Sequence, residues 1–165
     1  MHEHAGSNDR PRLLTHPYRW LDQHFLVSGL MKKKLVLTRD DIDRILAHAR
    51  AEAIANLWAV TIVIVDDGGH PLALERLDEA APASAYIAME KARTSALGRR
   101  PSADYEEMIK AGRNAFLSAP LTAMLEGGVP IVVGGQVVGA VGVSGVKSSQ
   151  DAQVASAGVA SLESA

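Results

Sequence analysis

The first regular hydrophobic pattern along the chain follows Thr38. Apolar residues recur there at spacings of three and four, as on one face of an α-helix, at Ile42, Ile45, Leu46, Ala49, Ala53 and Leu57. Asp41 lies three residues after Thr38, a spacing typical of a capping box at a helix start. We therefore predict an amphipathic helix of about 19 residues that begins at Thr38.

Two pairs of apolar runs favour β-strands joined by tight turns. Val60–Val65 is rich in β-branched residues and is followed by the turn-forming stretch Asp66–His70 and a second run, Pro71–Leu74. A later pair is divided by Gly134-Gly135, which suits a two-residue turn with positive φ, and comprises Val129–Val133 and Val137–Val143. Both pairs are predicted to be β-hairpins.

Three further stretches have the composition of helices. Alanines line one face of Ser84–Leu97, and Gly98 is expected to end that helix in the left-handed conformation. A second helix is expected from about Ala103 to Phe116. A last helix is expected near Ser148, which would cap it, with Asp151 at the capping-box position.

These elements predict the fold class. Two hairpins require antiparallel pairing, which excludes a purely parallel sheet. The strands are apolar on both faces, so helices are expected to cover both sides of the sheet. The sequence therefore predicts an α/β protein, a three-layer sandwich with an antiparallel β-sheet flanked by helices, in which a subunit contact could replace part of one helical layer.

Residues 1–30 differ from the rest, and Lys32–Lys34 mark the change. We expect an N-terminal extension, partly disordered, before one domain that spans residues 31–165. Tyr18–Leu26 has the pattern of a short amphipathic helix that would pack on this domain or on a neighbouring subunit. Polar residues interrupt every apolar stretch of the extension, so no secretory signal is expected, and we predict a cytoplasmic protein.

Composition narrows the classes of partner and chemistry. The 165 residues suffice for a single core, and 17 basic against 19 acidic side chains leave a net charge of −2. Nucleic acid is therefore not an expected partner, and no apolar run approaches the ~20 residues of a membrane span. The absence of cysteine excludes thiol catalysis and cysteine-based metal sites.

The strand Val137–Val143 has one almost flat face, because Ala140, Gly142 and Ser144 follow one another there. Another backbone or a flat ligand must approach such a face closely. We favour a packed helix, such as the alanine-rich one from Ser84, over a ligand.

The end of this strand is a candidate anion site. Ser144, Gly145 and Lys147 precede the last helix, whose first N–H groups and dipole could hold a carboxylate or phosphate. An ordinary capped helix explains the same residues, and Asp151 would oppose an anion. Val146 rather than glycine precedes Lys147, so the stretch is not a Walker A loop.

The first hairpin turn and the next helix carry the other candidates. His70 could ligate haem iron or a divalent metal, although a single surface histidine and an Asp-Gly-Gly turn need no function. Arg76 and Lys91 could bind an acidic ligand, or they could pair with acidic neighbours such as Asp78. A nucleophile elbow, a zinc-protease helix and a dinucleotide fingerprint are all absent from the sequence.

Several stretches together resemble, in order and spacing, the GlcG/HbpS-like family that is often labelled haem-degrading. They are Val65–His70, Arg76–Asp78, Ser84, Lys91, Ala92, Thr94, Gly127–Pro130, Gly139–Gly145, Gln150, Asp151, Ala157 and Gly158. The resemblance runs from Met31 to the C-terminus. Two positions depart from the family pattern, since Glu79 stands for a glycine and Ala152 for an acidic residue.

The resemblance implies a profilin-like sandwich, a homo-oligomer, and a small molecule or tetrapyrrole as ligand. Family members include secreted haem sensors, domains fused to corrinoid adenosyltransferases, and proteins that accompany the breakdown of glycolate or aromatic acids. Our first hypothesis is accordingly an oligomeric binding or accessory protein for haem, a corrinoid or a small organic acid. Its expected ligand-binding residues are Arg76, Asp78, Lys91, Ser144, Gly145 and Asp151.

Two alternatives stay open at this point. One is an enzyme acting on a small acidic or aromatic metabolite in a catabolic pathway, with Lys91 or His70 as general base and Arg76 holding a carboxylate. The other is a purely structural assembly subunit, which the two-sided apolar sheet would suit.

Overall fold

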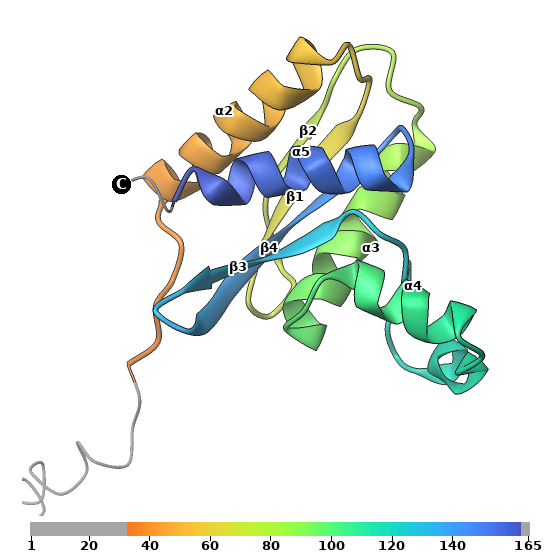
Figure 1. Cartoon of the computed structure of the whole chain (residues 1–165). Coiled ribbons are helices and arrows are strands. Elements are labelled where there is room, and N and C mark those ends of the chain that lie inside the picture. The colour runs from red at the N-terminus through yellow and green to blue at the C-terminus, as the bar shows by residue number, and fades with distance from the viewer. Residues whose placement is uncertain (1–32, 163–165) are drawn as a thin grey trace, which may run out of the picture. The chain divides into compact units, whose positions relative to one another are not determined.

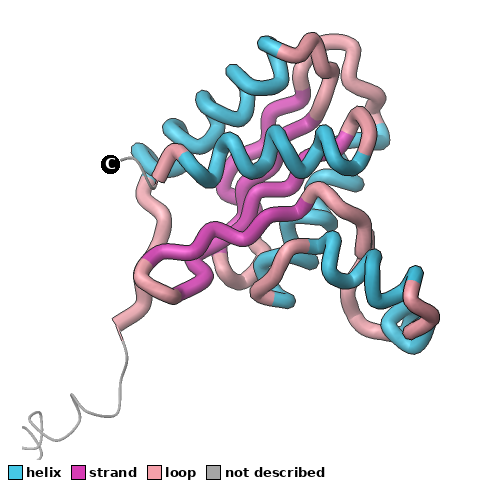
Figure 2. The backbone as a smooth tube through the Cα atoms, viewed as in Figure 1, coloured by secondary structure: helices cyan, strands magenta, loops and turns pink. Residues whose placement is uncertain are grey.

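The computed structural model describes residues 33–162, which form one α/β sandwich (Figure 1). Four antiparallel strands lie in the order β2-β1-β4-β3 (Figure 2). They are β1 (Thr61–Asp66), β2 (Pro71–Arg76), β3 (Gly128–Val133) and β4 (Gln136–Ser144). The predicted fold class and both predicted hairpins are confirmed. The predicted extension, including the helix Tyr18–Leu26, lies outside the described residues.

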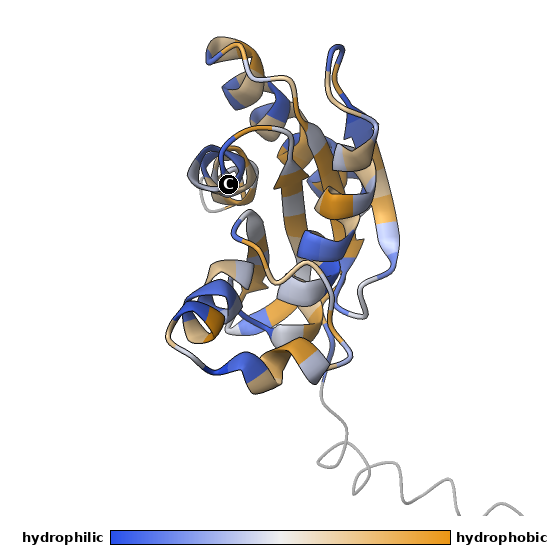
Figure 3. Ribbon diagram, turned by 90° about the vertical axis from the view of Figure 1, so that its right-hand side faces the viewer, coloured by the Kyte–Doolittle hydropathy of each residue, from blue (hydrophilic) through white to orange (hydrophobic). Residues whose placement is uncertain are grey.

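Helices α2 (Arg39–Ala55) and α5 (Ser148–Ala160) cover one face of the sheet (Figure 1). Their buried side chains pack on strand residues that alternate along β1 and β4, among them Ile62, Ile64 and Val141. The capping box at Thr38 is formed as predicted, because Thr38 N–H donates to Asp41 and Asp41 N–H donates to the Thr38 hydroxyl. Hydrophobic residues line the strands between the helical layers (Figure 3).

Helix α3 (Ala83–Gly98) covers the opposite face. Its alanines Ala88, Ala92 and Ala96 form a second buried cluster with Val63 and Ala140. A Cβ atom on Gly142 would overlap the carbonyl oxygen of Ala88 and the N–H of Ala92. The flat face of β4 is thus occupied by the alanine-rich helix, as we favoured, and it leaves no room for a flat ligand.

Three helix ends differ from the predictions. Arg99, with φ 54°, takes the left-handed position expected of Gly98, because α3 continues one residue further. The helix predicted from Ala103 to Phe116 begins at Ser102, ends at Lys110 as α4, and is followed after Gly112 (φ 92°) by the 3-10 helix η2 (Asn114–Ser118). A positive φ at Gly112 is incompatible with a continuous helix. The first helix likewise ends at Ala55 instead of Leu57.

The start of α5 also differs in detail. Lys147, and not Ser148, occupies the N-cap position, and its N–H donates to the side chain of Gln150 at 3.2 Å. Asp151 is buried and serves a different partner, described below. Among residues 33–162, none of the helices has the length and apolar character needed to cross a bilayer.

Candidate ligand-binding site

One end of the sheet gathers most of the predicted site residues. Ser144 pairs with Thr61 across β4 and β1, and Thr61 pairs with Arg76 across β1 and β2. Directly opposite residues share a face, so these three side chains form one row on the side covered by α3. Ser84 at the start of α3 closes this row, since its hydroxyl lies 2.6 Å from the Thr61 hydroxyl.

The members of the row differ in how far they are exposed. Thr61, Ser84 and Ser144 are buried, whereas Arg76 is exposed at the end of edge strand β2. Gly145, with φ 154°, follows Ser144 directly and lies against the backbone of Ala59, which leaves no space for a side chain. The sheet end can therefore offer a guanidinium group to solvent, beside hydroxyls that are mostly shielded.

Lys91 and Asp151 meet inside the protein. The Nζ atom of Lys91 lies 2.8 Å from Asp151 Oδ2 and donates to the carbonyl oxygen of Val143 at 3.1 Å. The two side chains are only 3% and 2% exposed. The other carboxylate oxygen of Asp151 accepts the N–H of Val146 at 3.2 Å. This ion pair ties α3, the end of β4 and the start of α5 together.

Burial raises the pKa of the Asp151 carboxyl, although the hydrogen bond and charge of Lys91 act in the opposite direction. The sequence analysis predicted Lys91 and Asp151 as ligand-binding residues, and the structure places both beside the start of α5. Neither group faces solvent, however. Their contact with a ligand, and the role of Lys91 as a general base, stay predictions that require this pair to open.

The glycines of the Gly127–Pro130 stretch are explained by this pair. A Cβ atom on Gly127, where φ is 123°, would lie 2.8 Å from Lys91 Nζ and 3.0 Å from Asp151 Cβ. A Cβ atom on Gly128 would overlap the Lys91 carbonyl oxygen. The backbone of both residues therefore covers the ion pair, and side chains there would force it apart.

His70 lies at the other end of the sheet, in the turn between β1 and β2. Its Nδ1 atom is 3.1 Å from Asp66 Oδ1, and the same oxygen accepts the backbone N–H groups of Gly68 and His70 at 2.9 Å and 2.8 Å. The imidazole is 78% exposed. Asp66 thus fixes one ring nitrogen of His70, while the ring itself faces solvent.

Burial acts to raise the pKa of Asp66, but the hydrogen bonds from His70 and Gly68 outweigh it and lower the pKa below its ordinary value. Asp66 is therefore ionised at neutral pH and can hold a proton on Nδ1 of His70. A neutral imidazole in that tautomer presents Nε2 as a free electron-pair donor.

The distance along β2 separates His70 from Arg76. Pro71–Arg76 is a six-residue strand, and at about 3.3 Å per residue its ends are roughly 17 Å apart. Within one subunit, His70 therefore cannot act as general base on a small acid held by Arg76. The version of the enzyme hypothesis that combines these two residues would need a second subunit.

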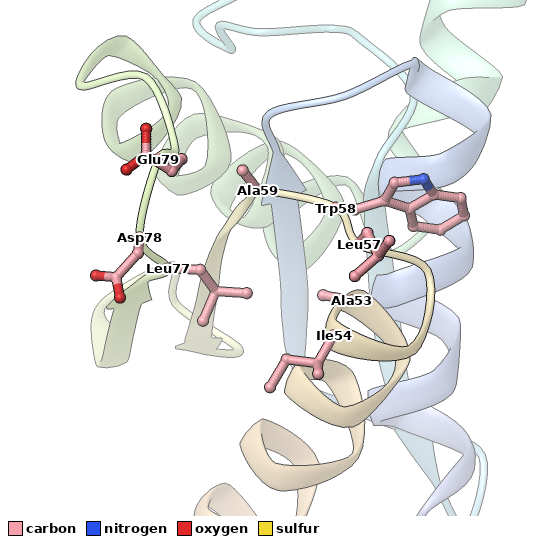
Figure 4. A pocket seen from close by; sticks show the side chains of 8 residues that line it. All are labelled: Ala53, Ile54, Leu57, Trp58, Ala59, Leu77, Asp78 and Glu79. Carbon is pink, nitrogen blue, oxygen red and sulfur yellow. The ribbon is translucent and has the colours of Figure 1, made fainter.

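A hollow of about 410 Å³ lies between the end of α2 and the loop after β2 (Figure 4). Its walls are apolar and include Ile54, Leu57, Trp58 and Leu77. The carboxylates of Asp78 and Glu79 border it but point away from Ile54 and Leu57 (Figure 4). Asp78 is thus placed beside a cavity, as a ligand-binding residue would be, yet this cavity has no basic side chain to hold an acid.

Sequence reasoning missed several residues of these sites. Leu57 was assigned to the core face of a helix, whereas it has φ 59° and is 92% exposed beside the hollow. Thr61 and Ser84 were not proposed as a hydroxyl pair, because their proximity depends on the packing of α3 on β1. Asp66 was interpreted as a turn residue, and its four-residue spacing to His70 was the one available signal.

Comparison with known proteins defines the class. The family model described as "Haem degrading protein HbpS-like" matches residues 37–160. The GlcG protein of Escherichia coli K12 is 56% identical over 114 residues, which is 69% of this chain and 85% of that protein. The fold and these matches define a small α/β domain of one known type. The chain belongs to the HbpS-like family.

Solved structures agree with this assignment. A crystal structure of a double mutant of Streptomyces reticuli HbpS is 28% identical, with a TM-score of 0.73, over 81% of this chain and 92% of that one. Klebsiella pneumoniae ORFY is 25% identical with a TM-score of 0.74, over 81% and 96%. A PduOC complex with haem, at 22% identity and a TM-score of 0.70 over 77% and 95%, shows the shared fold.

The described residues can be compared with the ligands that haem iron needs. No group of three or more metal-ligating side chains is found within residues 33–162, so the described residues form no multidentate site for a free divalent cation. Haem iron already has four ring nitrogens and needs one or two protein ligands. An exposed histidine whose other nitrogen is held by a carboxylate meets that need, so His70 fits the group.

Proposed function

We propose that this protein is an oligomeric small-molecule-binding protein whose ligand is a metal tetrapyrrole, haem above all, ligated by Nε2 of His70. The observation that carries the proposal is the contact between His70 Nδ1 and Asp66 at 3.1 Å beneath a largely exposed imidazole. Metal-ligating histidines commonly have such a carboxylate behind them, which fixes the tautomer and makes the ligand nitrogen more basic. The family description adds independent support.

The exposure of His70 supports the oligomeric part of the proposal. Bound cofactors bury most of their surface in protein. A turn that leaves its imidazole 78% exposed can contact only part of a tetrapyrrole. In our proposal a second copy of the chain covers the rest of the tetrapyrrole, in agreement with the predicted homo-oligomer.

A titration with hemin tests the proposal directly. We expect the Soret band to shift and sharpen on addition of protein, and we expect His70→Ala to lose this change. His48→Ala is the matched control, because His48 is also an exposed histidine but lies on α2 with its Nδ1 at 2.9 Å from the carbonyl oxygen of Arg44. An unchanged spectrum, or equal binding by His70→Ala and the wild type, would exclude His70 as the ligand.

A second ligand class is favoured by Arg76. Within the described part of the chain, Arg76 has no ion-pair partner, and it lies in one row with Thr61 and Ser144. A small organic acid would satisfy the guanidinium by a bidentate contact. We expect carboxylates to raise the melting temperature in a thermal-shift screen and Arg76→Ala to lose the gain. No gain with the wild type would exclude this ligand class at Arg76.

A further inference from the structure

The turn that carries His70 packs directly on helix α3. Gly69 has φ 78° and is buried. A Cβ atom there would lie 3.4 Å from Cγ of Arg93 and 3.6 Å from Cγ of Leu97. The backbone next to His70 therefore lies close to the stems of Arg93 and Leu97, within reach of a ligand that extends from the turn onto α3.

Arg93 and Leu97 are one turn apart on α3, and both are exposed although neither belongs to the buried clusters. Each offers what a tetrapyrrole with acidic side chains requires. Leu97 provides an apolar surface next to the turn. Arg93 provides a guanidinium, the side chain best suited to bind a carboxylate through two parallel hydrogen bonds.

The present partner of Arg93 can be exchanged. Arg93 Nη1 lies 3.1 Å from Glu90 Oε1 in an exposed pair three residues apart. Exposed pairs of this kind contribute little to stability, because solvent screens both charges. The other oxygen of Glu90 accepts the hydroxyl of Thr122, so Glu90 keeps a hydrogen-bond donor when Arg93 turns to a ligand.

We propose that Arg93 selects the ligand of His70 by its free carboxylate groups, with Leu97 as the adjoining apolar contact. This inference rests on the proposed function and names the class of tetrapyrrole bound: one with ionised carboxylate side chains, as opposed to a neutral, esterified one. His70 supplies ligation to both kinds of tetrapyrrole, whereas Arg93 distinguishes between them.

The test uses hemin and hemin dimethyl ester, which differ in the carboxylates alone. Both are titrated into the full chain and its variants, with affinity measured from the Soret band. We expect Arg93→Ala to bind hemin about tenfold more weakly, which is the effect of losing about 1.4 kcal/mol, and to bind the ester as the wild type does. Arg93→Lys should recover part of the loss, because it restores the charge without the planar fork.

Two further variants complete the design. Arg39→Ala removes an exposed arginine from an equivalent helix pair, with Asp43, and should change neither affinity. Leu97→Ala should weaken hemin and its ester to the same extent. If Arg93→Ala binds both ligands as the wild type does, while His70→Ala binds neither, the inference is wrong and the proposed function stands. If the wild type binds no hemin, both are wrong.

Discussion

At the scale of single residues, the structure gives the predicted site residues unequal roles. Lys91 and Asp151 form a buried ion pair, Ser144 and Thr61 are mostly shielded, and Arg76 and His70 are exposed. A sequence pattern indicates which residue types recur together, but it does not distinguish a buried pair from a binding site. The same charged residue types serve both purposes.

Removing one partner of the buried pair should destabilise the protein strongly. Lys91→Met leaves the Asp151 carboxylate without its cation, and losing one partner of a buried ion pair costs about 3–5 kcal/mol. Urea unfolding of Lys91→Met, and of Lys91→Met with Asp151→Leu, measures the effect. We expect the double variant to recover part of the loss. A change below about 1 kcal/mol for Lys91→Met, as expected of an exposed pair, would contradict this role.

Gly142→Ala tests the close approach of α3 to the sheet. The added methyl group would overlap the backbone of α3 at Ala88 and Ala92, and overpacking of this kind costs about 1–3 kcal/mol or more. We expect a lower melting temperature in thermal unfolding followed by circular dichroism. Gly68→Ala is a milder control, since its Cβ would meet only the movable side chains of His70 and Asp66. Equal melting temperatures for Gly142→Ala and the wild type would contradict the packing.

At the scale of elements, the sequence predicted what is local and periodic. Thr38, Asp41 and the 3.6-residue spacing locate α2, and Gly134 and Gly135, with φ 56° and 75°, form the predicted turn between β3 and β4. Helix ends were less predictable, because Leu57 and Arg99 adopt left-handed conformations that glycine favours and that residues of their type rarely adopt. Contacts between distant segments, such as Arg93 with Gly69, depend on how α3 packs on the hairpin.

Replacing Leu57 by glycine should stabilise the protein. Leu57 ends α2 in a Schellman arrangement, in which its N–H donates to Ile54 and the N–H of Trp58 donates to Ala53 at 2.9 Å. Leucine at φ 59° is strained by about 1–2 kcal/mol, and its side chain is almost fully exposed. The greater flexibility of glycine in the unfolded chain offsets part of the gain.

We therefore expect Leu57→Gly to raise the free energy of unfolding by up to about 1 kcal/mol, measured by urea denaturation. Leu57→Ala is the control, since it removes the side chain but keeps the strain. If both substitutions change stability equally, the left-handed conformation of Leu57 is not the cause.

Glu106 makes the stability of the protein depend on pH, through its hydrogen bond to the loop before β3. The hydrogen bond from the N–H of Glu126, together with the Lys110 side chain, lowers the pKa of Glu106 below its ordinary value of 4.5. A carboxyl with a lowered pKa contributes stability above pH 4.5 that is lost as the pH falls through the folded-state pKa. We expect Glu106→Gln to be less stable than the wild type at pH 7 and equal to it below that pKa. A difference that is constant with pH would contradict this.

At the scale of the whole molecule, two exposed apolar surfaces are candidates for the subunit contact that the proposed function requires. One joins Leu74 of β2 to Tyr86 and Met89 of α3, around a hollow of about 230 Å³. The other surrounds Ile54 and Leu57 at the end of α2. The first lies on β2, which begins directly after His70, and on α3, which contains Arg93, so a subunit that covers it also approaches the proposed haem site.

We therefore expect a second copy of the chain to bind the surface formed by Leu74, Tyr86 and Met89. Tyr86 is 79% exposed, and aromatic residues with such exposure are typical of the core of subunit interfaces. Tyr86→Glu would bury a charge in that interface and should lower the molar mass measured by light scattering during gel filtration. Ile54→Glu adds the same charge to the competing surface and should leave the mass unchanged. Dissociation by Ile54→Glu alone would assign the interface to the end of α2 instead and would separate it from His70.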